Sequence, residues 1–208
     1  VIRVELPKGS TSRICEPSFS DSSADLKSVQ FMAFNRNKRS IALDPSSEKD
    51  IETLNELIRR ADFIFESSPS KTLSSYGIDF NTAKRLNERI VYVRISPFGD
   101  DGPHANFLGN DLVVASMGGP VALQGEPERE PIKLSVPQVW RHAGVEAASG
   151  AMAAHARMLK TGEGQFVDVS AQCVMTWTML NAMDAHAIQG FDFQRLGAQV
   201  NNGMVITD

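Results

Sequence analysis

The sequence is poor in the features that mark secreted and membrane-spanning proteins. Only two cysteines, Cys15 and Cys173, occur among 208 residues, and they do not form a pair with metal-ligand spacing. No apolar run approaches the roughly 18 residues of a membrane span, and the first residues lack the pattern of a signal peptide. We therefore expect a cytoplasmic protein that does not interact with membranes, in which both cysteines are reduced and packed inside.

An excess of charge of one sign is also lacking. The chain has 21 Lys and Arg residues against 25 Asp and Glu, which gives a formal net charge of −4. This balance argues against a general nucleic-acid surface, although a local basic patch can still hold a small anion. The 42% hydrophobic residues are typical of a globular protein that forms its core unaided. Because the chain starts on a strand-like run without Met, we expect residues upstream of it.

The usual catalytic signatures are missing too. The sequence has no phosphate-binding loop, no Gly-x-Gly-x-x-Gly after a strand, no Gly-x-Ser-x-Gly and no His-Glu-x-x-His. The histidines show no metal-ligand spacing, so the sequence predicts no metal site. They are His104, His142, His155 and His186.

What the sequence does contain is an alternation of strand and helix patterns. Alternating or compact apolar runs predict strands at residues 1–6, 40–43, 62–66, 90–95 and 165–169. Helical spacing predicts helices after Asp44 and at residues 80–89, 111–117, 139–159 and 171–189. Asp44, Asn81 and Asp111 are the expected N-caps. This order predicts an α/β, Rossmann-like fold with a parallel sheet and flanking helices.

Three further segments carry specific expectations. Residues 8–27 are predicted to form a long surface loop. Residues 96–110, which are rich in Gly and Pro, follow a predicted strand at the sheet edge where α/β proteins bind ligands. The helix at residues 139–159 is rich in small residues, and Gly150 within it predicts that another part of the chain packs closely there.

A run of cations precedes the predicted strand at residues 40–43. Arg36, Lys38 and Arg39 fall within five residues. A solvated turn is the more common meaning of such a run. The functional alternative is a phosphate clamp, because Arg offers a planar fork of donors and Lys a mobile point charge to an anion.

The order of these segments resembles the large domain of the class III CoA-transferases, the family of formyl-CoA transferase, carnitine CoA-transferase and α-methylacyl-CoA racemase. The resemblance runs in order over nearly all 208 residues, and no single motif carries it. It implies one large domain over residues 1–208 that lacks the first strand and the small C-terminal domain of the family. It also implies an interlocked homodimer or a second CoA-transferase half as partner. The matching segments are Val1–Glu5, Asn35–Ile41, Leu43–Asp44, Ala61–Glu66, Ile95–Pro103, Asp111–Val113 and Thr161–Ser170.

The resemblance also implies a chemistry, and this chain departs from it. In the transferases an Asp attacks an acyl-CoA, which gives a mixed anhydride and then an aspartyl-CoA thioester during CoA transfer to a carboxylic acid. The position of that Asp falls on Trp140, whose indole cannot act as the nucleophile. The racemases add a His thirty residues earlier, and that position falls on Asn110, which has no pKa suited to proton transfer.

The resemblance places the coenzyme contacts on residues that are partly altered. The family segment Glu-Asn-Phe-Arg-Pro-Gly corresponds to Glu66–Lys71, and a following Arg is replaced by Ser75. Since each lost phosphate contact can remove about 1.5–3 kcal/mol, we expect weak CoA binding. The expected contacts are Arg36, Lys38, Arg39, Leu43, Asp44, Ser67, Ser68, Asn110 and Asp111.

Two interpretations follow from these departures. In the first, the chain is part of a CoA-transferase whose active carboxylate comes from elsewhere in the protein or from a partner. In the second, it is a non-catalytic half that serves as a scaffold or dimerisation domain of a tandem CoA-transferase. The joint loss of nucleophile, proton carrier and nucleotide anchors favours the second interpretation for this segment, whereas the intact fold motifs favour a CoA-transferase as its parent.

Overall fold

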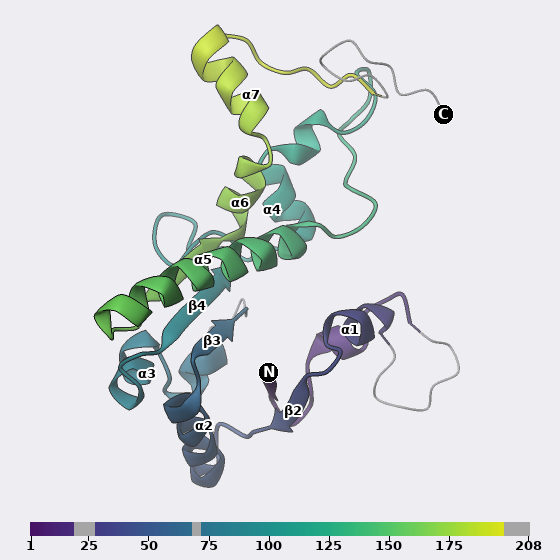
Figure 1. The fold of residues 1–208 in the computed structure, drawn as a ribbon. Coiled ribbons are helices and arrows are strands. Elements are labelled where there is room, and N and C mark those ends of the chain that lie inside the picture. Colours follow the sequence, from purple (N-terminus) through teal and green to yellow (C-terminus); the bar gives the residue numbers. More distant parts are fainter. Residues whose placement is uncertain (19–27, 68–71, 198–208) are drawn as a thin grey trace. The chain divides into compact units, whose positions relative to one another are not determined.

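The computed structural model describes residues 1–18, 28–67 and 72–197 (Figure 1). The chain forms two compact units, Val1–Arg60 and Ala61–Asp208. Each unit contains a parallel sheet and at least one helix, so the predicted combination of parallel strands and flanking helices is confirmed.

The first unit is built on two parallel strands. Strand β1 (Ile2–Glu5) pairs with β2 (Arg39–Ala42), with Arg3 opposite Ser40 and Glu5 opposite Ala42. Between them the chain forms a 3₁₀ turn at Thr11–Arg13 and helix α1 (Val29–Phe34), which the sequence pattern did not predict. The Ser28 hydroxyl caps α1 by accepting the Phe31 N–H. Of the predicted loop at residues 8–27, positions 19–27 lie outside the described residues.

Helix α2 (Glu48–Arg60) closes the first unit. It begins later than predicted, and the assignment of Asp44 as its N-cap was wrong. The Asp44 carboxylate instead accepts the backbone N–H and the hydroxyl of Ser46, in a turn that precedes the helix. The Ser47 hydroxyl accepts the Asp50 N–H in the first turn. Acidic residues begin the helix and arginines end it, as the helix dipole favours.

The second unit contains a three-stranded parallel sheet in the order β3–β4–β5, formed by Phe63–Glu66, Val91–Ser96 and Phe166–Ser170. Helix α5 (Val139–Thr161) lies along one face of this sheet, as Figure 1 shows. Because side chains alternate along a strand, one row turns to α5 and the next to the opposite face. The core beneath α5 consists mainly of Val91, Val93, Val169, Ala143, Ala147, Ala151 and Ala154.

In helix α3 (Phe80–Leu86) the N-cap lies two residues before the expected one, and in helix α4 (Asp111–Met117) it lies one residue before. The Asp79 carboxylate, rather than Asn81, accepts the Thr82 N–H at the start of α3. Asn110, rather than Asp111, caps α4 by accepting the Val113 N–H. In both cases the capping residue has an extended backbone that directs its side-chain oxygen to the third residue of the helix.

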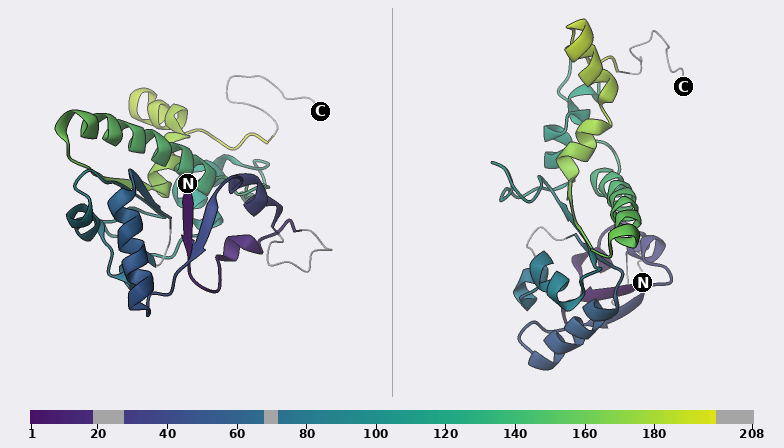
Figure 2. Two further views of the ribbon diagram at one scale, coloured as in Figure 1. Left: turned by 60° about the horizontal axis from the view of Figure 1, so that its bottom comes forward. Right: turned by 60° about the vertical axis from the view of Figure 1, so that its left-hand side comes forward.

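The predicted helix at residues 171–189 is broken into three pieces. They are α6 (Ala171–Trp177), α7 (Leu180–Asp184) and a π-helical turn, Ala185–Gln189, which follow one another in Figure 2. At the first break the Thr178 N–H is shared between the carbonyls of Val174 and Met175, and the Thr178 hydroxyl donates to Met175 as well. This tighter bonding ends the regular α-helical ladder, although the apolar spacing of the sequence continues across it.

The small residues of α5 serve the close approach that the sequence predicted. A Cβ atom added at Gly150 would lie 2.9 Å from Cγ1 of Val167 in strand β5. At Gly144, on the same helix, an added Cβ would meet nothing within 4 Å. Only part of the small-residue surface therefore faces the sheet.

We expect Gly150→Ala and Gly144→Ala to change stability in opposite directions. Gly150→Ala should lower the free energy of unfolding by about 1 kcal/mol, because the clash with the stiff Val167 side chain outweighs the better helix propensity of Ala. Gly144→Ala should raise it by up to about 1 kcal/mol, since only the helix propensity changes. Urea denaturation followed by circular dichroism measures both. Equal effects at the two positions would contradict the packing described for Gly150.

The cysteines and the helices of the described residues test two further expectations from the sequence. Cys15 and Cys173 are both free, and both are exposed, so the expectation that they are packed inside was wrong. Within the described residues, no helix is both long enough and apolar enough to cross a membrane.

Candidate functional site

The two residues Asn110 and Asp111 link the starts of helices α4 and α5. Asn110 caps α4, which leaves the neighbouring Asp111 carboxylate free to turn to another partner. It accepts the backbone N–H of Val139, the first residue of α5, at 3.0 Å. The residue before α5, Gln138, makes no capping bond of its own, so Asp111 takes over that role.

This hydrogen bond brings together positions that are about thirty residues apart in the sequence. Trp140 follows Val139 in the first turn of α5, so the positions expected for nucleophile and proton carrier lie around one helix junction. We use this term for Asn110, Asp111, Val139 and Trp140. Val139 is fully buried, whereas Trp140 is 39% exposed and Asn110 is exposed. The only carboxylate within the junction is that of Asp111.

The loop between β4 and α4 is held at the carboxyl end of the sheet. The Gly99 N–H donates to the Ser96 hydroxyl at 2.8 Å, and the Asp100 N–H donates to the Asp168 carboxylate at 2.8 Å. Gly99 has a φ of 94°, a conformation that L side chains rarely adopt. The Gly- and Pro-rich loop predicted at this edge is therefore a structured turn anchored to β4 and β5.

A row of charged side chains crosses the sheet on the face opposite α5. Glu66 of β3, Arg94 of β4 and Asp168 of β5 are paired across the parallel strands. Glu66 is only 5% exposed, and its carboxylate accepts the Tyr92 hydroxyl at 2.9 Å and the Leu73 N–H at 3.0 Å. Burial and the neighbouring Glu66 charge raise the pKa of Tyr92 well above its usual range, so its hydroxyl stays protonated.

Asp168, at the β5 end of this row, has a perturbed pKa. Partial burial raises the pKa of Asp168, and the nearby charges of Asp100 and Asp101 act in the same direction. The Asp100 N–H and the Arg94 charge oppose this rise without cancelling it. Arg94 itself forms an ion pair with Asp100 at 3.0 Å.

We expect Asp168→Asn to retain or slightly raise stability at neutral pH, by less than about 1 kcal/mol because the site is partly solvated. A raised pKa in the folded state means that ionised Asp168 is disfavoured by folding, so its contribution declines as the pH rises through that pKa. Asn keeps an acceptor for the Asp100 N–H and removes the charge. Urea denaturation of both proteins at pH 7 and pH 3 tests this expectation. A large loss at pH 7 would show that the Asp168 charge is stabilising.

A cavity of about 300 Å³ lies over Glu66 and Arg94 of this row. Buried Glu66 and Tyr92 and the partly buried Arg94 line it together with the start of α3. Among the described residues, none of those predicted from the sequence to bind coenzyme lines it. No sequence pattern indicates this cavity, because the residues that line it become neighbours only through strand pairing.

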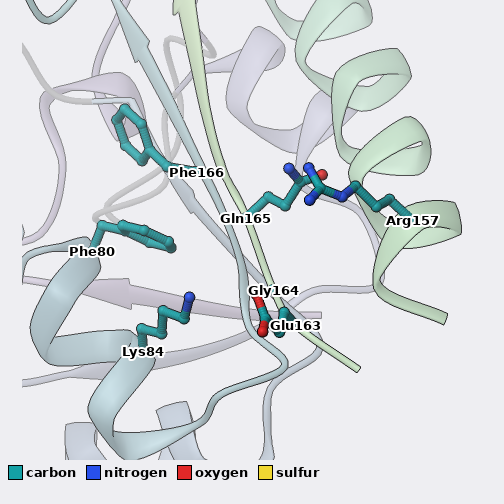
Figure 3. Close-up of a pocket in the computed structure, with 7 residues that line it drawn as sticks. All are labelled: Phe80, Lys84, Arg157, Glu163, Gly164, Gln165 and Phe166. Atoms are coloured by element: carbon teal, nitrogen blue, oxygen red, sulfur yellow. The ribbon is translucent and has the colours of Figure 1, made fainter. Parts of the chain in front are cut away.

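A second cavity, of about 250 Å³, lies at the start of β5 and shares Phe80 and Phe166 with the first (Figure 3). Figure 3 shows Phe80 and Lys84 on one side of the strand and Arg157 on the other. No predicted site residue within residues 1–18, 28–67 and 72–197 belongs to this cavity. It is lined by Phe80, Lys84, Arg157, Glu163, Gly164, Gln165 and Phe166.

The predicted basic turn belongs to the first unit and joins α1 to β2. Arg36 and Arg39 are exposed, and Arg39 begins β2. Lys38 is exposed as well, but its ammonium donates to the side-chain oxygen of Asn35 at 3.1 Å. The same oxygen accepts a hydrogen bond from Arg3 of β1, also at 3.1 Å. Arg3 and Asn35 lie 32 residues apart, so no local pattern in the sequence connects them.

A buried carboxylate organises the surroundings of Arg3. Glu5 is 8% exposed, and it forms ion pairs with Arg3 and Arg13 and accepts the Ser40 hydroxyl at 2.9 Å. These contacts, led by the hydrogen bond from Arg13, outweigh burial and lower the pKa of Glu5 to about 2. Both guanidinium groups also lie over the ring of Phe31, at 5.0 Å for Arg3 and 4.5 Å for Arg13.

The remaining predicted coenzyme contacts are dispersed. Leu43 is 3% exposed, and its backbone N–H donates to the Glu5 carbonyl. Hydrogen bonds from Ser46 lower the pKa of Asp44. Ser67 is exposed directly after β3, and Ser68 lies outside the described residues. In the described part of the chain, no group of three or more His, Cys, Asp and Glu side chains could hold a metal ion.

Comparison with known proteins identifies related sequences over almost the whole chain. The model of CoA-transferase family III matches residues 1–207. The succinate–glutarate CoA-transferase of Agrobacterium fabrum is 32% identical over 200 residues, which are 95% of this chain and 50% of that protein. The formyl-CoA:oxalate CoA-transferase of Streptomyces avermitilis is 33% identical over 172 residues, 83% of this chain and 41% of that protein.

A solved structure of a related protein is also similar to this chain. The crystal structure of a CAIB/BAIF family protein from Brucella suis matches with a TM-score of 0.88 and 31% identity, over 98% of this chain and 57% of that one. The chain thus spans about half the length of the relatives it matches.

Proposed function

Because the chain belongs to CoA-transferase family III, we propose that it is the large-domain part of a protein that moves CoA between an acyl-CoA thioester and a carboxylic acid. The proposal further holds that this segment does not supply the nucleophilic carboxylate. The observation that carries it is Trp140 in the first turn of α5, beside Asn110 and Asp111.

The chemistry explains why Trp140 matters. CoA transfer through the enzyme requires an oxygen nucleophile that attacks the thioester carbonyl and expels the CoA thiolate, and that afterwards gives up its acyl group. An indole ring has no such oxygen. The one carboxylate of the helix junction, Asp111, is already committed to the Val139 N–H. The active carboxylate would then come from another part of the protein or from a second chain.

A second candidate function is a non-catalytic scaffold or dimerisation half. It is supported by the simultaneous change at three places: Trp140, Asn110 and the segment after β3, where Ser67 stands in place of a larger polar anchor. Under this candidate the fold and its surfaces are retained while CoA binding is weak or absent. Both candidates agree that no covalent intermediate forms on residues 1–208.

The finer architecture is also part of the proposal. The family resemblance supports a further strand before β1, a small C-terminal domain and an interlocked dimer in the cytoplasm. Strands β1 and β3 each pair with only one other strand among the described residues, so each sheet has an edge that a further strand could cover.

The test is to incubate the protein with an acyl-CoA and a carboxylate acceptor and then to add hydroxylamine, which traps acyl-enzyme and enzyme-CoA intermediates. Mass spectrometry of the peptides locates any adduct. We expect no adduct on Asp or Glu within residues 1–208. CoA binding measured by calorimetry separates the candidates, because the transferase role requires binding and the scaffold role does not. An adduct on a carboxylate of this segment would overturn both.

A further inference from the structure

We infer that the exposed face of helix α5 is the apolar centre of an interface between two copies of this chain. In this interface the two α5 helices pack antiparallel about a two-fold axis that passes near Met152. The inference adds a surface and a geometry to the dimer of the proposed function, and in that respect it rests on the proposed function. It does not depend on the CoA chemistry.

Helix α5 is apolar on its exposed face as well as on the face that covers the sheet. Val145, Met152 and Leu159 are 69%, 60% and 64% exposed. They follow one another at intervals of seven residues, which turn an α-helix by about 700°, so the three side chains lie within about 40° of one another. Ala154 is buried and is separated from Met152 by about 200° of rotation, so the exposed residues lie opposite the buried face.

Two alanines complete this exposed face. Ala148 and Ala156 lie between the three larger residues, on the same side of the helix, and both are exposed. We call these five positions the outer stripe: Val145, Ala148, Met152, Ala156 and Leu159. A helix that is buried on one face only normally carries polar residues on the other. An outer stripe with a seven-residue repeat is instead typical of a helix that packs against a second helix.

A second copy of α5 matches the outer stripe when it runs antiparallel. With Met152 at the two-fold axis, Val145 of one copy lies opposite Leu159 of the other, since each is seven residues from Met152. Ala148 likewise lies opposite Ala156. Large residues then meet at the centre and near both ends, and the alanines between them let the two helices approach closely. Because a two-fold interface joins the same surface of both copies, one stripe supplies both sides of it.

The charges beside the outer stripe favour the antiparallel over the parallel arrangement. Glu146 and Lys160 are exposed and flank the stripe on the same side, within about 40° of each other. In an antiparallel pair, Glu146 of each copy lies near Lys160 of the other, because the two residues are at similar distances from Met152. A parallel pair would place Glu146 beside Glu146 and Lys160 beside Lys160, and it would also align the two helix dipoles unfavourably.

The first test is disulfide cross-linking in the full-length protein, after the exposed Cys15 and Cys173 have been replaced by Ser. Met152→Cys should form a disulfide between two chains, because the axis brings the two identical positions within the roughly 4.4–6.8 Å between Cα atoms that a disulfide spans. Met32→Cys, at an exposed position of α1, controls for random collisions and should not cross-link. Non-reducing gels and mass spectrometry identify the products.

Pairs of different cysteine variants test the direction of the helices. A mixture of Val145→Cys and Leu159→Cys proteins should give a mixed disulfide. Neither variant alone should cross-link, because in an antiparallel pair each position lies about 21 Å along the helix from its own counterpart. In a parallel pair each variant would cross-link with itself, and the mixture would give no mixed product.

The second test measures the dimer dissociation constant by analytical ultracentrifugation. Met152→Asp should raise it by about a hundredfold or more, because a charge enters the apolar centre of the interface twice. Met32→Asp, the matched control on α1, should change it less than about threefold. Glu146→Lys and Lys160→Glu should each raise it by about threefold to tenfold, and the two together should restore it. All are exposed positions, and circular dichroism checks their folding.

The outcomes separate this inference from the proposed function. A dimer that forms without the Met152→Cys cross-link overturns the α5 interface, while the dimer of the proposed function stands. If the cross-link forms but acyl-CoA does not bind, the interface stands and the CoA-transferase function fails. A protein that is monomeric at all concentrations overturns both the interface and the proposed dimer.

Two further results would also overturn the inference. Self-cross-linking of Val145→Cys would show that the helices are parallel. If the cysteine of Met152→Cys neither cross-links nor reacts with a maleimide, another part of the same chain or a different protein covers the outer stripe.

Discussion

Replacing Trp140 with Asp is expected to give the protein a carboxylate that acyl-CoA can label. The position lies in the first turn of α5, where the partial positive charge of the helix N-terminus favours an acidic side chain. Trp140 is 39% exposed, so its removal leaves no sealed cavity, and the buried Val139 beside it is unchanged. We expect hydroxylamine-trapped adduct at residue 140 at least about a hundredfold above the wild-type background, because loss of a nucleophile typically costs 10³-fold or more.

The matched control is Trp140→Asn, which has nearly the same size and shape as the Asp variant but no nucleophilic carboxylate. It should remain at the wild-type background. Labelling of Trp140→Asp at residue 140 would show that the rest of the site is competent and that one substitution separates this segment from the chemistry of its relatives. If both variants stay unlabelled while acyl-CoA binds, the defect extends beyond Trp140. If the wild type is labelled at Asp111, the assignment of that residue as a helix cap alone is wrong.

Loss of the Glu5 charge is expected to produce the largest change in stability. Glu5→Gln leaves Arg3 and Arg13 without their shared carboxylate, and both side chains are mostly buried. We expect the free energy of unfolding to fall by about 3 kcal/mol, in the range measured when one partner of a buried ion pair is removed. The matched control is Glu52→Gln on α2, whose ion pair with Arg59 is exposed, and it should cost less than about 1 kcal/mol.

The contribution of Glu5 to the free energy of unfolding is expected to fall at low pH. Because the pKa of Glu5 is lowered from 4.5 to about 2 in the folded state, its contribution is fully present above pH 4.5 and is lost as the pH falls towards 2. Denaturant titrations at a series of pH values should therefore show the wild type and Glu5→Gln converging in this window. A difference that persists unchanged at pH 2 would mean that packing, rather than charge, accounts for the loss.

Much of the architecture follows from local patterns in the sequence. The apolar strands at residues 62–66 and 90–95, the helix of small residues and the α/β order are found close to where they were predicted. Strand and helix periodicity depend on residues within one or two turns, so a linear sequence displays them directly. The break at Thr178 was missed because the apolar spacing continues while the backbone bonding changes.

The helix caps show where local prediction fails. Asn110 and Asp111 are neighbours, and both are good capping residues, so the sequence does not say which one caps α4. The choice depends on Val139, 28 residues away, whose N–H needs an acceptor that Gln138 does not provide. Similarly, Asp79 and Asn81 both suit the start of α3, and the extended backbone at Asp79 decides between them.

By itself, the sequence determined the fold class, the resemblance to the CoA-transferases and the presence of Trp at position 140, where that resemblance leads us to expect the nucleophile, because each rests on residue identity and order. The tertiary structure decided which polar residues meet: Asp111 with Val139, Glu66 with Tyr92, and Arg3 with Lys38 on Asn35. Such contacts depend on strand register and on turns that bring polar atoms of segments about 30 residues apart in sequence to hydrogen-bonding distances of 2.9–3.1 Å. Hydrogen bonds and ion pairs lose most of their strength over one or two ångströms, so only the folded chain fixes them.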